Sequence, residues 1–314
     1  MSEFQTSPGM RDLLPPDSTR ARRFVGVFCE LVERAGYGEL TTPLIEDLGV
    51  FVRIGDATDV VTKEMYDFHD KGGRHVALRP ELTASVCRAY TQHRPTPPWK
   101  VWYAGPNFRY EKPQRGRTRE FFQWNIDLLG SESSAADAEI VAIGAEFLRS
   151  LGLSSGTVGI YLNSRRLMER LLSEIGLGGA LLMDAFRLID RRDKLSPDKW
   201  REWALDLGLS ADQIEALTAL LADPNLWQES DELRQIFATA EALGLAGYLT
   251  SDASIVRGLD YYTGPVFEAY DRARKFRAIF GGGRYDNLVA DVGGDRLTGV
   301  GFAMGDVIIE LLLD

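Results

Sequence analysis

The chain has 314 residues, is 45% hydrophobic and 26% charged, and carries a formal net charge of −10 at pH 7. This composition is typical of a soluble globular protein with a real core, in one large domain or two. The acidic balance argues against a general nucleic-acid coat protein, and no apolar run approaches the length of a membrane span. The N-terminus lacks a secretory signal, so we expect a cytoplasmic protein without membrane association.

The cysteines and histidines form no pattern of a disulfide framework or a metal centre. Cys29 and Cys87 suit a reducing cytoplasm. His69, His75 and His93 are scattered without the spacing of metal ligands, so we expect no metal held by the protein alone.

The first elements in the chain are predicted to be a helix and a short strand. Apolar residues recur at helical spacing over 17–35, with Asp17 and Ser18 as caps and Gly36 as the stop. Residues 38–45 are β-branched and contain a proline near their end, which is typical of an edge or interface strand.

A strand hairpin is predicted next. Residues 78–90 indicate a loop leading into a helix, and residues 135–151 indicate a further helix. Between them, 100–104 and 121–129 alternate in the manner of strands, and the turn that joins them is long and rich in charge.

A change in composition near Asn163 predicts a separate helical insert over 163–246, within a core formed by 1–162 and 247–314. Ser196 and Ser210 are predicted to start two of its helices. Its helical periods cover 167–175, 183–189, 200–207, 211–221 and 232–243.

Strands are predicted to return at Ile255, 263–270 and 278–280, before a last helix near Gly305. Because the strands follow one another as hairpins rather than around helices, we expect a mainly antiparallel sheet. The run Gly281–Gly283, taken alone, suits either a tight turn or a close approach of two backbones.

Two short segments, 109–119 and 272–277, concentrate positive charge on this acidic protein. Such local patches indicate a defined anion site, although for the second patch a solvated face is an equal alternative. Several arginines along one hairpin loop can contact the phosphates of a single nucleotide.

The strand that leaves the hairpin carries groups for reading a small ligand. Phe121 is suited to stack on a base, and Gln123 and Asp127 are four apart, so both face the same side of a regular strand. One of these two side chains can bind an amino group of the ligand, and the other can accept a hydrogen bond from a ring N–H of the ligand. The alternative is that the hairpin tip is only a set of salt bridges.

The segment Arg257–Gly264, with the sequence RGLDYYTG, combines a cation, a carboxylate, two phenols and two glycines. These groups are costly to bury and excessive for a surface turn. A pocket that binds a small polar ligand beside a phosphate would use them.

These segments together resemble histidyl-tRNA synthetases. The hairpin that begins at Arg109 resembles the second motif of class II aminoacyl-tRNA synthetases. Further segments are similar to parts of the histidine enzyme, in the same order, so that the resemblance runs from about residue 6 to 313: 7–15, 37–43, 78–83, 257–264 and 281–286. The resemblance implies an α+β fold with a class II synthetase-type antiparallel sheet flanked by helices and an inserted helical domain.

The resemblance also implies residue roles. For ATP, Arg109 and Arg257 would hold the α-phosphate from opposite sides as the catalytic pair, Glu111 would lie near the adenine, Arg117 would hold the outer phosphates and Phe121 would stack on the base. For histidine, the α-amino group would be bound by Glu81, Thr83 and Gln123. The imidazole ring would be surrounded by Asp127, Tyr262 and Tyr285.

The implied activity is that of a histidine–tRNA ligase. Such an enzyme activates histidine with ATP and Mg²⁺ to histidyl-adenylate and pyrophosphate, and then transfers histidine to the 3′ end of tRNA(His). A homodimer is also implied. The alternative is a non-catalytic, synthetase-like regulatory subunit of ATP phosphoribosyltransferase, and a third possibility is a synthetase-like domain used for another purpose, such as sensing tRNA.

Two departures from the family pattern favour the regulatory alternative. The third motif usually ends in an arginine that stacks on adenine, but Ile308 occupies the corresponding position. The sequence also ends at Asp314, before the C-terminal anticodon-binding domain that the family normally has, which we therefore expect to be absent.

Overall fold

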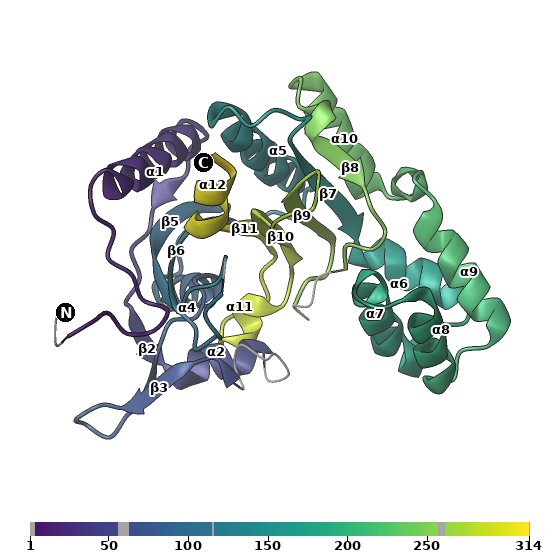
Figure 1. The fold of residues 1–314 in the computed structure, drawn as a ribbon, viewed down its shortest axis with the longest axis horizontal. Coiled ribbons are helices and arrows are strands. Elements are labelled where there is room, and N and C mark those ends of the chain that lie inside the picture. Colours follow the sequence, from purple (N-terminus) through teal and green to yellow (C-terminus); the bar gives the residue numbers. More distant parts are fainter. Residues whose placement is uncertain (1–3, 56–62, 115, 257–260, 314) are drawn as a thin grey trace.

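Figure 1 shows the protein as a computed structural model, which describes residues 4–55, 63–114, 116–256 and 261–313. The described strands form one large sheet of eight strands, in the order β1-β5-β6-β11-β10-β9-β7-β8. Their bounds in that order are Gly38–Glu39, Trp99–Phe108, Glu120–Leu129, Gly299–Gly305, Phe280–Tyr285, Pro265–Asp271, Val158–Ser164 and Leu249–Ser251. Only the two outermost pairs, β1 with β5 and β7 with β8, are parallel among the paired strands of this sheet.

A second, smaller sheet has the order β2-β4-β3. It consists of Ile45–Asp47, His75–Leu78 and Tyr66–His69, with α2 (Leu48–Gly55) beside it.

The large sheet lies between two hydrophobic cores, with helices on both faces (Figure 1). α1 (Asp17–Arg34) and α5 (Ser134–Ser150) cover one face, where Trp124 and Ile126 of β6 are buried. α4 (Thr83–His93) and α11 (Leu288–Asp291) cover the other. Because side chains alternate along a strand, β6 turns its even-numbered residues to the first core and its odd-numbered residues to the second.

A helical segment leaves the sheet after β7 and returns at β8. Its α-helices are α6 (Arg165–Glu174), α7 (Leu182–Asp190), α8 (Pro197–Asp206), α9 (Ala211–Ala222) and α10 (Asp231–Ala242). Short 3₁₀ turns occur at Gly179–Leu181, Arg192–Lys194, Leu226–Glu229 and Ala246–Tyr248. In Figure 1, α6 to α9 cluster to one side of the sheet, whereas α10 lies along α5.

Serine caps explain where several of these helices begin. The hydroxyl of Ser196 accepts from the N–H of Lys199 at 3.4 Å, as its position before Pro197 predicts. Ser210 forms a reciprocal capping box with Gln213. Both predicted helix starts are therefore confirmed.

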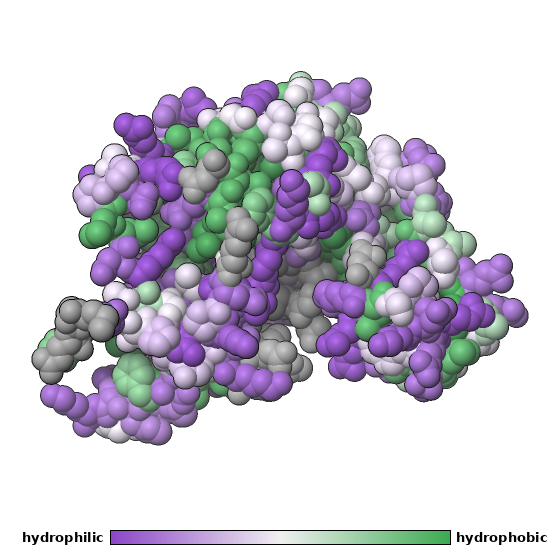
Figure 2. Space-filling model, viewed as in Figure 1, coloured by the Kyte–Doolittle hydropathy of each residue, from purple (hydrophilic) through white to green (hydrophobic). Residues whose placement is uncertain are grey.

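The last helix, α12 (Asp306–Leu313), follows β11 directly. Figure 2 shows hydrophobic residues gathered on the surface where α12 lies, and its Leu311 and Leu312 are only partly buried. No helix in the described ranges has both the length and the apolarity needed to cross a membrane.

The predicted α+β class with a mainly antiparallel sheet is confirmed, and so is the β5–β6 hairpin. Three local predictions are wrong.

Residues 38–45 do not form one strand, because β1 pairs with β5 in the large sheet and β2 pairs with β4 in the small one. The predicted capping side chains of α1 make no cap, since Pro16 holds the cap position without a side-chain hydrogen bond. Ile255 lies outside any strand.

The triple glycine is part of a strand and not a turn. Gly281–Gly283 lie within β10, paired with β9 on one side and β11 on the other. A Cβ on Gly282 would overlap the carbonyl oxygen of Gly301, so glycine is required by the close approach of the two strands.

Candidate active site

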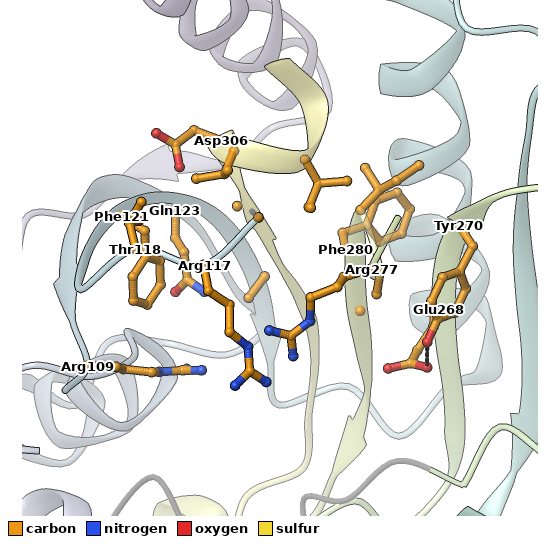
Figure 3. A pocket seen from close by; sticks show the side chains of 18 of the residues that line it. Arg109, Arg117, Thr118, Phe121, Gln123, Glu268, Tyr270, Arg277, Phe280 and Asp306 are labelled. Carbon is orange, nitrogen blue, oxygen red and sulfur yellow. Dashed lines mark hydrogen bonds between the residues drawn. The ribbon is translucent and has the colours of Figure 1, made fainter. Parts of the chain in front are cut away.

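A cavity of about 480 Å³ opens where the β5–β6 hairpin faces β10 and the start of α12 (Figure 3). Its volume is in the range of small-molecule sites. Four parts of the chain contribute to the lining. The hairpin supplies Arg109, Glu111, Arg117, Phe121 and Gln123; β9, β10 and the segment between them supply Glu268, Tyr270, Arg277 and Phe280; α12 supplies Asp306 and Ile308; and the helical segment supplies Lys194. The four described residues predicted for ATP therefore all line one cavity.

The hairpin register places these residues. β5 and β6 pair from Trp99 with Leu129 to Phe108 with Glu120, and the N–H of Arg109 donates to the carbonyl of Arg119 at 2.9 Å. The loop then turns at Gly116, whose φ of +81° favours glycine.

Arg109 is held in place from both sides. Its Nε donates to the carbonyl of Pro80 at 2.9 Å, and its guanidinium lies 5.3 Å from the centre of the Phe121 ring. Burial lowers the pKa of Arg109, while the nearby carboxylates Glu111 and Glu81 oppose that shift, so the group stays a cation.

Some of the charged side chains at the hairpin tip pair with groups of the hairpin itself, as in the alternative that the tip is a set of salt bridges. Nε of Arg117 lies 2.9 Å from Oε2 of Glu111. Arg119 stacks over Tyr110 at 3.8 Å and donates to the carbonyl of Glu111 at 3.0 Å. Arg119 therefore stabilises the loop, whereas Arg109 and Arg117 reach the cavity.

A buried carboxylate lies further along the same strand. Asp127 is 2% exposed, and its two oxygens accept from the hydroxyls of Tyr103 and Tyr285. Burial raises the pKa of Asp127 to about 7, and the two tyrosine hydrogen bonds oppose the shift. Gly301 lies opposite on β11, where a Cβ would overlap the carboxylate.

Tyr262 and Tyr285 belong to one aromatic cluster beside this carboxylate. The ring of Tyr261 lies 4.6 Å from that of Tyr262 and 6.1 Å from that of Tyr285. A Cβ on Gly283 would come within 2.8 Å of the Tyr262 ring, so the glycine strand allows the ring to pack closely. The two predicted imidazole-facing tyrosines are thus brought together.

Glu81 lies at the N-terminus of α4. Its carboxylate accepts from the backbone N–H groups of Thr83 at 2.9 Å and Ala84 at 2.6 Å. Burial raises the pKa of Glu81, and these N–H groups and the charge of Arg109 oppose the rise. The charge of Glu81 also contributes to the raised pKa of Asp127, so Glu81 interacts electrostatically with both Arg109 and Asp127.

Gln123 is oriented by a neighbour on β5. Its Oε1 accepts from Nδ2 of Asn107 at 3.0 Å. Gln123 and Asp127 both lie on the regular strand β6, four residues apart, which places them on the same face. Thr83, the first residue of α4, is buried nearby.

Arg257, the other predicted catalytic residue, lies outside the described residues. The site residues that the sequence reasoning missed include Tyr103, which bonds Asp127, and Arg277, Glu268 and Tyr270, which line the cavity. A signal for Tyr103 was available, because the predicted hairpin places it on the same face as Asp127. Among the described residues, no group of three or more histidine, cysteine or carboxylate side chains is arranged to hold a metal ion.

Comparisons with known proteins identify the family. A family profile described as histidyl-tRNA synthetase matches residues 9–306. The chain is 38% identical to the chloroplastic/mitochondrial histidine–tRNA ligase of Arabidopsis thaliana, with 97% of this chain and 65% of that relative covered. It is 34% identical to the histidine–tRNA ligase of Haloarcula marismortui, with 98% and 74% covered.

Solved structures that resemble this chain include histidyl-tRNA synthetases. Apo histidyl-tRNA synthetase of S. aureus is 28% identical with a TM-score of 0.66, with 99% of this chain and 69% of that one covered. An ATP phosphoribosyltransferase regulatory subunit/histidyl-tRNA synthetase from Bacillus halodurans C has a TM-score of 0.84 at 23% identity, with 100% and 83% covered, which shows a shared fold. The family profile and the relatives agree over nearly the whole chain, and the protein therefore belongs to the histidyl-tRNA synthetase family.

Proposed function

We propose that this chain activates histidine with ATP, forming histidyl-adenylate and pyrophosphate, and passes the histidyl group to the 3′ end of tRNA(His). One observation carries the proposal: β6 carries both Gln123, which lines a cavity with several arginines, and Asp127, a buried carboxylate bonded to two tyrosines. The carboxylate and its tyrosines suit an imidazole ring, and the cavity lined by arginines suits a triphosphate. Glu81 interacts electrostatically with Arg109 and Asp127, and we assign it to the α-amino group of a bound histidine.

The geometry supports an in-line reaction at the α-phosphorus. The histidine carboxylate oxygen forms a bond to this phosphorus as the bond to the pyrophosphate oxygen breaks, and negative charge grows on the equatorial oxygens. Arg109, fixed by Pro80 and Phe121, is a preplaced cation for that charge. We assign Arg257 the opposite side of the same phosphate from the family resemblance.

The remaining roles follow the positions of the side chains. Phe121 would stack on adenine with Glu111 nearby, and Arg117 would hold the outer phosphates. Glu81, Thr83 and Gln123 would bind the α-amino group, and Asp127, Tyr262 and Tyr285 would surround the imidazole. Apolar amino acids would be rejected because the buried hydrogen-bonding groups would be left unpaired.

ATP is expected to enter with Mg²⁺, which neutralises charge on the phosphates. Glu111 and Glu268 line the same cavity and offer the oxygen ligands that this ion prefers. Glu111 is already paired with Arg117, and Glu268 accepts from the hydroxyl of Tyr270 at 2.6 Å.

The domain and subunit organisation is also proposed. We assign 1–162 and 247–314 to the catalytic core and 163–246 to the insert, although α10 packs on α5 of the core. A homodimer is supported by Leu44 and Ile45, which are 44% and 48% exposed just after the segment that resembles the first motif. Sedimentation would test it, and a monomer at micromolar concentration would contradict it.

Histidine-dependent exchange of pyrophosphate into ATP tests the activity. Exchange above background that requires histidine is expected. A folded sample that binds histidine but shows no exchange would contradict the proposal.

The isoleucine at position 308, where the family pattern has an arginine, favours the regulatory-subunit alternative. Against this alternative, the described positions assigned to histidine and to the α-phosphate all carry polar or charged side chains that can bind these groups. The alternative requires that the chain bind and stimulate a phosphoribosyltransferase subunit, which a mixed-subunit assay would detect.

A further inference from the structure

Three guanidinium groups converge on the cavity. Figure 3 shows Arg109, Arg117 and Arg277 pointing toward one another, the first two from the hairpin and the third from the segment before β10. Like charges directed into one space repel, so this arrangement is stabilised when an anion with several charges lies between them.

The first two cations are partly compensated by the protein itself, and the third is not. Arg117 pairs with Glu111, and Arg109 lies in the field of Glu111 and Glu81. For Arg277, no ion pair or side-chain hydrogen bond occurs within the described part of the chain. Glu268, a carboxylate that also lines the cavity, accepts from the hydroxyl of Tyr270.

The segment that carries Arg277 is anchored by its other charged residues. Arg272 donates to the carbonyls of Ser155 at 2.6 Å and Gly247 at 2.8 Å. Arg274 stacks on Tyr161 and Tyr270, at 4.1 Å and 3.9 Å from their ring centres.

The turn before Arg277 is fixed as well. The carboxylate of Asp271 accepts from the N–H groups of Lys275 and Phe276, and the N–H of Ile279 donates to the carbonyl of Ala269 at 2.7 Å. The cationic patch at 272–277 is therefore divided by the structure: Arg272 and Arg274 hold the segment in place, and Arg277 points into the cavity.

Ile308, on the α12 side of the cavity, is apolar where the family pattern has the positive charge of an arginine. It is 7% exposed and lies against the hairpin loop, where a Cβ on Gly116 would be 3.2 Å from its Cδ1. An apolar contact with the loop thus occupies the place where the family pattern has an arginine.

We propose that Arg277 binds the polyphosphate of ATP opposite Arg117, as a cation from a different segment of the chain in a cavity whose position 308 is apolar. The inference deepens the proposed function and rests on ATP as the ligand of this cavity. The guanidinium binds phosphate oxygens through paired N–H donors, which a lysine at the same position would reproduce only in part.

Equilibrium binding of Mg–ATP and of adenosine to purified variants tests the proposal. Arg277→Ala is expected to weaken ATP binding about tenfold or more, as expected for loss of a charged hydrogen-bond donor. Adenosine and histidine binding are expected to stay within about twofold, and Arg277→Lys is expected to fall in between. Lys275→Ala is the matched control, because it removes one positive charge from the same patch without lining the cavity.

Two results would overturn the assignment. ATP affinity that is unchanged in Arg277→Ala would remove the residue from the site, and equal losses for ATP and adenosine would move it from the phosphates to the base. Histidine binding measured on the same samples shows that the variant is folded.

The two proposals fail separately. If the wild type lacks exchange activity but Arg277→Ala still loses ATP affinity selectively, the ligase activity is wrong and the phosphate contact stands. If exchange is present and both KM for ATP and ATP affinity are unchanged in the variant, the activity stands and the role of Arg277 is wrong.

Discussion

The guanidinium of Arg284 lies against the carboxylate of Asp137, with Nε 2.9 Å from Oδ1 and both side chains at most 2% exposed. Arg284 also donates to the carbonyl of Ser131 at 2.9 Å. The pair joins β10 to α5 on one face of the sheet, while the next residue, Tyr285, points to the other face and reaches Asp127. This anchor therefore positions a residue of the proposed histidine site.

Asp137→Ala is expected to destabilise the protein by about 3–5 kcal/mol, because it leaves the Arg284 cation buried without its counter-charge. Urea denaturation measures the change. Asp184→Ala is the matched control: it breaks an exposed pair with Arg187 and should cost at most about 0.5 kcal/mol. Equal effects of the two substitutions would contradict the role of the buried pair.

Histidine binding is expected to weaken as the pH falls below about 7. The pKa of Asp127 is raised to about 7 by burial, so its proton is bound below that pH and the carboxyl can no longer accept an N–H from the imidazole with its full charge. The KM for histidine in the exchange reaction should therefore rise from pH 8 to pH 6. Free histidine also titrates in this range, so a variant is needed to assign the effect.

Tyr103→Phe supplies that assignment. The Tyr103 hydroxyl lowers the pKa of Asp127, so its removal should raise this pKa and move the rise in KM to higher pH. Titration of the free ligand is the same in both proteins. Tyr37→Phe, which removes a hydroxyl bonded to Glu139 at 2.8 Å, is the control and should leave the profile in place. A profile that is identical in all three proteins would refute the role of Asp127.

Two glycines on β11 are expected to respond differently to alanine. A Cβ on Gly301 would overlap Oδ1 of Asp127 and the carbonyl of Ile126, whereas one on Gly305 meets nothing within 4 Å. Gly301→Ala should therefore lower histidine affinity about tenfold or more through displaced buried groups, as expected for overpacking that costs about 1–3 kcal/mol. Gly305→Ala should leave histidine affinity unchanged. Calorimetric titration with histidine compares them, and similar affinities would contradict the prediction.

Arg257→Ala is expected to reduce exchange about 10²–10³-fold or abolish it, because a preplaced donor to the reacting phosphate is lost. The thermal midpoint should change little. Arg191→Ala, at an exposed position of the helical segment, is the control. If Arg257→Ala unfolds the protein instead, the residue has a structural role.

The elements that depend on local pattern were predictable. The β5–β6 hairpin follows from alternation on both sides of a charged turn, and its two strands and loop carry Arg109, Phe121 and Asp127. The motif resemblance then added Glu81, whose place at a helix N-terminus is also a local feature.

The errors arise where distant segments decide the structure. Residues 38–45 divide between two sheets because their partners, β5 and β4, come later in the chain. Gly281–Gly283 form a strand because β9 and β11 approach closely from both sides. Arg277 could not be separated from its charged neighbours by sequence alone, since only folding directs it to the cavity.

The parallel pairing of β7 with β8 has a consequence for how this chain can evolve. Ile160 faces Leu249 and Leu162 faces Ser251, so the chain leaves the sheet and returns to it at adjacent positions. The intervening residues can therefore be lengthened, shortened or exchanged for another module while the sheet keeps its path. The contacts that such a change would disturb include those of α10 with α5, the ion pair of Arg166 with Asp286, and Lys194 in the cavity lining. Natural variation in length within this family should concentrate between Ser164 and Ser230, and a graft at these two points should leave the sheet intact while removing Lys194 from the cavity lining.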